Sequence, residues 1–173
     1  MKEQQISLLV QFPLLDERPD LWGYLWKDIF AICGITDPLK RKEIYKNEII
    51  KNKFKIPNLI HPKNIIPKDL KIGFGNIIFN HVHLSFEVSI KNCSLISNFT
   101  DLGHNSIVND FVSIMPQTSI GGNCKIGNNT FIGSGSNVHQ NTNIGKNCKI
   151  GMGSIVINEI KNNHSVINFQ RQV

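Results

Sequence analysis

The chain has 173 residues, of which 40% are hydrophobic and 18% are charged. This composition excludes a disordered tail or a collagen-like fibre and predicts one or two soluble domains with an apolar core. The 19 lysines and arginines outnumber the 13 aspartates and glutamates, which gives a net charge of +6 and favours anionic partners such as phosphates. Because no block of five like charges exists, no nucleic-acid-binding surface is predicted.

The sequence predicts neither a membrane span nor a secretion signal. Its longest apolar runs, such as residues 6–10, are far shorter than the roughly 18 residues that cross a bilayer. The start of the chain lacks the cationic, apolar and small-residue regions of a signal peptide. We therefore expect a cytoplasmic protein. Its four cysteines form no C-x-x-C pair and are expected to be reduced, buried and apolar in character: Cys33, Cys93, Cys124 and Cys148.

The first third of the chain predicts a small α/β segment. Trp22 and Trp26 are four residues apart, a helical spacing that indicates one buried face or a dock onto a neighbour. A strand is expected over residues 29–35, a helix cap at residues 36–38, a helix over residues 39–51 and a second strand over residues 55–60. This order is β-α-β in outline.

A six-residue repeat dominates the rest of the chain. An aliphatic residue occupies every sixth position fifteen times without a break, at Ile72, Ile78, Leu84, Ile90, Ile96, Leu102, Val108, Ile114, Ile120, Ile126, Ile132, Val138, Ile144, Ile150 and Val156. Ile60 and Ile66 extend the series backwards, where Pro62 and Pro67 indicate a looser first coil. A second, mostly small series follows four positions after each aliphatic residue, from Asn76 to Ile160.

A period of six fits neither an α-helix nor a long strand, but it fits a parallel β-helix. Three hexads would close one triangular coil of eighteen residues, so that residue i stacks on residue i+18. The glycines that directly follow the aliphatic positions are expected to provide positive φ at the corners. Six phenylalanines fall outside the inward series, and some of them should line the faces of the prism: Phe74, Phe79, Phe86, Phe99, Phe111 and Phe131.

The hexad pattern resembles that of the left-handed β-helix hexapeptide-repeat acyltransferases, and the left-handed winding is implied by this resemblance. It covers more than half of the chain. The family's members are typically trimers that bind acetyl-CoA between adjacent prisms. The resemblance therefore implies an all-β solenoid with a homotrimeric assembly and acetyl-CoA as co-substrate.

One branch of the family, the sialic-acid O-acetyltransferases and UDP-amino-sugar N-acetyltransferases, is similar in three further stretches. Residues 103–116 (GHNSIVNDFVSIMP), 121–123 (GGN) and 131–136 (FIGSGS) resemble its active coil. Residues 30–42 and 57–62 look like the end of its Rossmann-like sugar-nucleotide domain. We therefore expect a shortened α/β segment at 1–62, a left-handed β-helix at 63–161 and a tail at 162–173. The branch's glycine-rich N-terminal turn is absent from residues 1–8, and its tail motif is altered at residues 166–171.

The resemblance implies an active site centred on His104. An acetyl transfer needs a base for the acceptor's proton, and imidazole titrates near neutral pH. Asn105 stands where the family has an acidic residue, so the base is predicted to be weaker unless Asp101 or Asp110 reaches it. Residues expected at acetyl-CoA, through backbone groups above all, are Ser113, Gly122, Ser134, Met152 and Gly153.

The predicted function is acetyl transfer to an amino or hydroxyl group of a sugar or nucleotide-activated sugar, in the biosynthesis of a bacterial surface glycan such as lipopolysaccharide or capsule. The alternative is a noncatalytic β-helix that scaffolds or binds. A zinc site at His81 and His83 is a third idea, but no third histidine partner is evident, so no metal is predicted.

Overall fold

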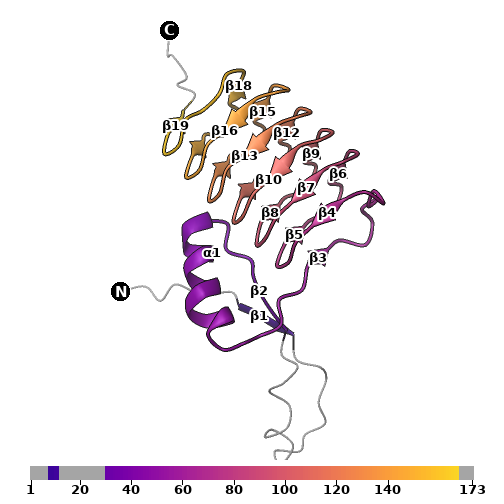
Figure 1. The fold of residues 1–173 in the computed structure, drawn as a ribbon, viewed down its shortest axis with the longest axis vertical. Helices are drawn as coiled ribbons and strands as arrows, with labels where there is room; N and C mark the ends of the chain where they lie inside the picture. Colours follow the sequence, from indigo (N-terminus) through magenta and orange to yellow (C-terminus); the bar gives the residue numbers. More distant parts are fainter. Residues whose placement is uncertain (1–7, 12–29, 168–173) are drawn as a thin grey trace, which may run out of the picture.

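The structure, a computed structural model, describes residues 8–11 and 30–167. From residue 59 onwards the chain winds into a stack of coils, whose short strands form three parallel sheets (Figure 1). We number these faces in the order in which each complete coil passes through them, starting from β5, β6 and β7. The first face has seven strands: β3 (Leu59–Ile60), β5 (Ile77–Ile78), β8 (Leu95–Ile96), β11 (Ser113–Ile114), β14 (Phe131–Ile132), β17 (Lys149–Ile150) and β19 (Ser165–Val166).

The other two faces have five strands each. The second face contains β6 (His83–Leu84), β9 (Asp101–Leu102), β12 (Ser119–Ile120), β15 (Asn137–Val138) and β18 (Ile155–Val156). The third face contains β4 (Lys71–Ile72), β7 (Ser89–Ile90), β10 (Ile107–Val108), β13 (Lys125–Ile126) and β16 (Asn143–Ile144). The first corner joins the first and second faces, the second corner joins the second and third, and the third corner closes the coil.

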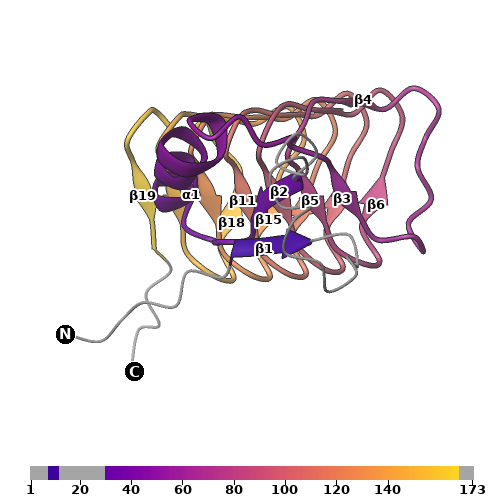
Figure 2. The same ribbon diagram turned by 90° about the horizontal axis from the view of Figure 1, so that it is seen from below.

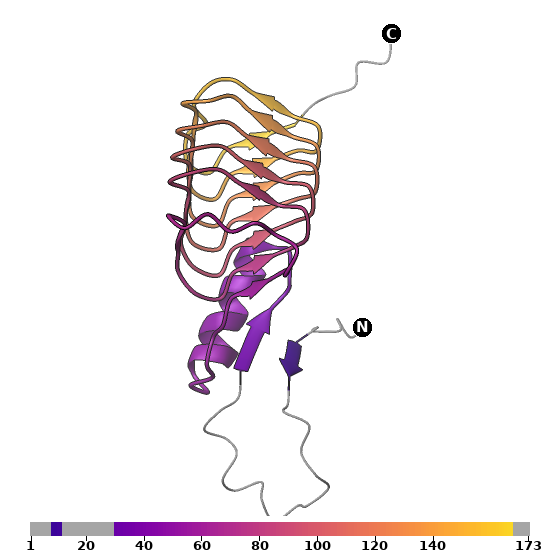
Figure 3. The same cartoon turned by 90° about the vertical axis from the view of Figure 1, so that its right-hand side faces the viewer.

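The hexad repeat forms the axis of this stack. Of its fifteen aliphatic side chains, all but the half-buried Ile72 are buried in one continuous core. The predicted register holds, because Ile114 pairs with Ile96 on one side and Ile132 on the other. Burial of one such side chain contributes about 2 kcal/mol, and ladder bonds such as Ser113 N–H to Thr130 O at 2.9 Å satisfy the backbone. Figure 3 shows the stacked coils from the side.

The coils extend beyond the expected limits of the β-helix at both ends. Leu59–Ile60 already pairs with Ile77–Ile78, and Ser165–Val166 pairs with Lys149–Ile150. The last coil is two residues short, so Ile160 pairs with Ile144 in the large aliphatic column. The assignment of Ile160 to the small series was therefore wrong. The other members of that series, from Asn76 to Ser154, are all buried.

The reason given for the repeat glycines was also wrong. None of the glycines that directly follow an aliphatic residue has positive φ; the positive values fall two residues later, as at Glu87, Asn105 and Asn123. The repeat glycines instead allow the backbones of adjacent coils to approach each other closely. A Cβ on Gly103 or Gly121 would lie 2.5 Å from a backbone nitrogen of the adjacent coil, which is too close for any side chain.

The N-terminal residues form a small unit that lies over the first face (Figure 2). The strand β1 (Leu8–Gln11) runs antiparallel to β2 (Phe30–Cys33). The helix α1 (Pro38–Ile44) continues as a π-helical segment, η3 (Tyr45–Ile50). The predicted cap is confirmed, since Asp37 Oδ1 accepts from the backbone N–H groups of Leu39 and Lys40 at 2.9 and 3.1 Å.

The single strand expected over residues 55–60 is divided. Lys55 forms a parallel bridge with Phe30, whereas Leu59–Ile60 belongs to the first coil. Pro57 lies between them and has no N–H group to donate, so one ladder cannot run through. The predicted face formed by Trp22 and Trp26 lies outside the described residues.

Arg41 fastens the N-terminal unit to the β-helix. Its side chain is buried, and Nε donates to Cys93 O at 2.9 Å, Nη2 to Val112 O at 2.9 Å, and Nη1 to Ile35 O at 2.5 Å and Ser113 Oγ at 2.8 Å. Burial lowers the pKa of its guanidinium to about 10, so the group is charged at neutral pH. Sequence patterns gave no sign of this role, because arginine in a helix is usually exposed.

The N-terminal unit also packs on the outside of the β-helix, through two small apolar clusters that are separate from the axial core. Tyr45 and Ile49 pack with Cys93 of the third corner, and Ile32 packs with Ile77 and Leu95 of the first face. All four cysteines are buried and free, as expected. Within the described residues, no helix is long and apolar enough to cross a membrane.

Replacing Arg41 with methionine tests this attachment. The change removes the side-chain donor of the Cys93 and Ile35 carbonyl oxygens and of the Ser113 hydroxyl, whereas Val112 O keeps the backbone N–H of Leu95. Each buried acceptor left without a donor costs about 1–3 kcal/mol. We expect the free energy of unfolding, measured by denaturant titration, to fall by about 3 kcal/mol or more. The neighbouring exposed Lys40→Met is the matched control and should change it by less than about 0.5 kcal/mol. Equal stability of the two variants would contradict the role of Arg41.

Candidate active site

His104 lies at the second corner, directly after β9. Its ring stacks on Phe86 of the preceding coil, with centroids 5.1 Å apart and planes at 8°. On its other side the ring covers Gly122, where an added Cβ would overlap the Nε2 atom. Both neighbours are eighteen residues from His104, so coil stacking holds the half-buried imidazole between an aromatic ring and a bare backbone.

Two hydrogen bonds orient the imidazole. Nδ1 lies 2.9 Å from Asn105 Oδ1, and Asn105 Nδ2 donates to Glu87 Oε2. A carboxylate accepts hydrogen bonds only, so the amide NH₂ must face Glu87 and the amide oxygen must face His104. The amide oxygen is itself an acceptor, so Nδ1 carries the imidazole proton. Nε2 therefore has a free lone pair, which is the arrangement of a general base.

The two carboxylates considered as partners of His104 are engaged elsewhere. Asp101 Oδ1 lies 2.5 Å from His83 Nδ1, and Asp110 accepts from Asn92 at 2.9 Å. The carboxylate that does reach the site, through Asn105, is that of Glu87. It was missed because it is distant in sequence, although the eighteen-residue stacking rule applied to Asn105 leads to it.

The five residues expected at acetyl-CoA fall in three places. Ser134, Met152 and Gly153 lie together at the first corner, after β14 and β17. Gly122 lies beneath the His104 ring. Ser113 is buried, and its hydroxyl accepts from Arg41 and donates to Thr36 O at 2.6 Å, so its side chain is committed to the N-terminal unit.

The first corner has room for an extended ligand. A Cβ built on Gly135 or Gly153 meets no atom within 4 Å, and 75% of Met152 is exposed. These residues fit a chain such as the pantetheine arm of acetyl-CoA, which could lie along their backbone. The whole second face lies between this corner and His104. The first corner precedes the strands of that sheet, and the second corner, which carries His104, follows them.

His81 and His83 do not converge. His81 stacks on Phe99, with ring centroids 5.0 Å apart, whereas His83 pairs with Asp101. Within residues 8–11 and 30–167, no group of three or more histidine, cysteine, aspartate or glutamate side chains is placed to hold a metal ion.

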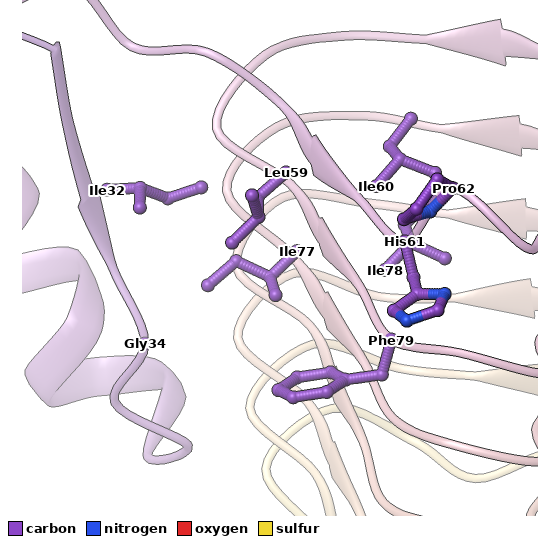
Figure 4. A pocket seen from close by; sticks show the side chains of 9 residues that line it. All are labelled: Ile32, Gly34, Leu59, Ile60, His61, Pro62, Ile77, Ile78 and Phe79. Carbon is purple, nitrogen blue, oxygen red and sulfur yellow. The ribbon is translucent and has the colours of Figure 1, made fainter. Parts of the chain in front are cut away.

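An apolar hollow of about 430 Å³ lies between β2 and the first coils (Figure 4). Ile32 and Gly34 line it from the N-terminal unit, and Leu59, Ile77 and Phe79 line it from the β-helix. His61 is the only titratable side chain in this lining. The hollow opens on the first face, away from the corner that carries His104, so it is no part of the candidate active site.

Comparison with known proteins identifies the repeat and the fold. Residues 105–140 match the family described as bacterial transferase hexapeptide (six repeats). No curated protein sequence matches the chain. Among solved structures, perosamine N-acetyltransferase from Caulobacter crescentus, in complex with CoA and GDP-perosamine, is similar with a TM-score of 0.77 and 19% identity over 80% of this chain and 66% of that one.

Two further structures are comparably similar. The acetyltransferase domain of PglB from Neisseria gonorrhoeae has a TM-score of 0.74 and 24% identity over 78% of this chain and 65% of that chain. WeeI from Acinetobacter baumannii has a TM-score of 0.78 and 18% identity, over 82% and 69%. The chain spans about two thirds of the length of these proteins. The likeness confirms the predicted fold class: the chain is a left-handed parallel β-helix of hexapeptide repeats.

Replacing Gly122 with alanine tests the packing of the imidazole. The new Cβ would lie only 2.4 Å from Nε2, which is too close, so the ring must shift from its stack on Phe86. We expect the ring-proton NMR signals of His104 to lose the ring-current shift that Phe86 imposes. Gly34→Ala is the matched control, because its Cβ would meet only Ile77 at an ordinary 3.9 Å. Unchanged His104 signals in Gly122→Ala would contradict the described geometry.

Proposed function

We propose that this protein transfers an acetyl group from acetyl-CoA to an amino or hydroxyl group of a sugar, with His104 as the general base. The observation that carries the proposal is the orientation of His104, whose Nδ1 is bound to Asn105 and whose Nε2 has a free lone pair. The hexapeptide-repeat match and the likeness to sugar N-acetyltransferases support it. At these identities the solved structures establish a shared fold, so the activity rests on the site.

His104 performs the proton transfer in this reaction. Nε2 accepts the proton of the acceptor's amine or hydroxyl while the acceptor's lone pair forms a bond to the thioester carbonyl carbon. Nδ1–H donates to Asn105 Oδ1, which stabilises the imidazolium that results. As the C–S bond breaks, the imidazolium returns the proton to the departing thiolate, which leaves as free CoA. The sugar then carries the acetyl group and His104 is neutral again.

The position of the two corners supports a homotrimer. His104 lies where the strands of the second face end, and the group of Ser134, Met152 and Gly153 lies where those strands begin. A site that needs both corners is completed when the second corner of one copy meets the first corner of another. Cyclic assemblies present such unlike surfaces to each other at every interface. We therefore propose that acetyl-CoA lies along the first corner of one protomer and is attacked beside His104 of the next.

A nucleotide-activated amino sugar is the proposed acceptor. Two of the similar structures are described as N-acetyltransferases or acetyltransferase domains, and one of them contains GDP-perosamine. The net charge of +6 suits a substrate that carries phosphates. Such a product would enter a surface glycan of a bacterium, either lipopolysaccharide or capsule, and its precursors would be acetylated in the cytoplasm.

The direct test is the release of CoA thiol from acetyl-CoA in the presence of nucleotide amino-sugars and sialic acids. We expect one acceptor class to give release, and His104→Ala to lower the rate about 10²- to 10⁴-fold, the usual contribution of a general base. His164→Ala, which removes an exposed histidine of the last coil, is the control and should keep the wild-type rate. A folded wild-type protein without release for any acceptor would contradict the proposal and favour a noncatalytic scaffold.

A further inference from the structure

We propose that Glu87 is a positioning residue for His104, acting through the side-chain amide of Asn105. The inference rests on the proposed function and deepens it. Three side chains form one hydrogen-bonded series across two coils, from the Glu87 carboxylate to the Asn105 amide and on to the imidazole. Asn105 alone is neutral, so Glu87 supplies the only negative charge in this series.

The series has one consistent direction. Glu87 can only accept, so it selects the orientation of the amide, and the amide selects the protonated nitrogen of the imidazole. Hydrogen bonds in such a series polarise one another, so the charge on Glu87 makes Asn105 Oδ1 a stronger acceptor. A stronger acceptor at Nδ1–H favours the tautomer in which Nε2 keeps its lone pair. No proton has to pass through the amide for this effect.

The corner backbone at Glu87 places its side chain against Asn105 of the next coil. Glu87 has a φ of +55°, at the corner position that Asn105, Asn123 and Asn141 occupy in the next three coils. Asparagine tolerates this left-handed conformation better than glutamate does. The corner is held by the backbone N–H of Glu87, which donates to Asp69 Oδ2 at 2.7 Å. Glutamate is thus placed where the local conformation favours asparagine, and its carboxylate meets Asn105.

Other charged groups near the corner are bound to different partners. Asp69 lies one coil before Glu87 and binds its backbone, not Asn105. Asp101 on β9 pairs with His83, and Asp110 accepts from Asn92. The two faces of the His104 ring meet Phe86 and Gly122, which carry no charge. Glu87 is therefore the carboxylate that the described contacts connect to the base.

Two substitutions separate the charge of Glu87 from its hydrogen bond. Glu87→Gln keeps an acceptor for Asn105 but loses the charge, and we expect it to lower the turnover rate about fivefold to tenfold. Glu87→Leu also loses the acceptor, so we expect a larger loss of rate.

A compensating variant tells a positioning role from a merely structural one. In Glu87→Gln combined with Asn105→Asp, a carboxylate lies directly beside Nδ1, and aspartate tolerates the positive φ at this position. We expect this variant to return to within about threefold of the wild-type rate. Glu159→Gln, an exposed glutamate of the last coil, is the matched control and should behave as wild type.

The tautomer of His104 can be read without any substrate, from long-range ¹H–¹⁵N NMR spectra of ¹⁵N-histidine protein. We expect wild type and Glu87→Gln to hold the proton on Nδ1, and Glu87→Leu to show both tautomers; His104→Gln identifies the signals. If wild type does not turn over but this pattern is found, the proposed function fails and the positioning by Glu87 stands. Identical spectra and identical rates in wild type, Glu87→Gln and Glu87→Leu would overturn the role of Glu87.

Discussion

The rest of the structure depends on the stacking of each coil on the next with a register of eighteen residues. A coil this narrow holds one large and one small side chain per hexad in its interior, so an aliphatic residue must return at the same place in every turn. The parallel ladders then satisfy the backbone, and neither the core nor the ladders can shift without the other. This constraint fixes the backbone of the corners, where side chains outside the core can bind ligands or react.

Corners that stack in register bring together residues that are far apart in sequence. Phe86, His104 and Gly122 form one such column, and Glu87 and Asn105 form the next. The position of the His104 imidazole and the direction of its Nε2 lone pair therefore follow from the stacking of the coils. The same principle joins the N-terminal unit to the β-helix, because Arg41 donates to carbonyl groups of two successive coils at Cys93 and Val112.

The repeat made the core and the coil register predictable, because few other folds suit an aliphatic residue at every sixth position. The special features at the corners were harder to predict. The repeat glycines were assigned to positive φ, whereas they prevent collisions between coils, which only a three-dimensional arrangement reveals. Ile160 was placed in the wrong series because the last coil is two residues short. Arg41 was missed because its carbonyl partners lie far away in the sequence, so no local pattern marks it as buried. Glu87 was missed because only Asp101 and Asp110 were considered as partners of His104.

We propose that coil stacking aims Nε2 of His104 at the acceptor, at a site completed by the first corner of a second copy. The most direct measurement is a crystal structure of the protein with CoA and a nucleotide amino-sugar. We expect Nε2 to lie within hydrogen-bonding distance of the acceptor nitrogen or oxygen, about 3 Å, and CoA to lie along Ser134, Met152 and Gly153 of the adjacent protomer. An acceptor bound away from His104, or a ring that turns Nδ1 toward the acceptor, would contradict it.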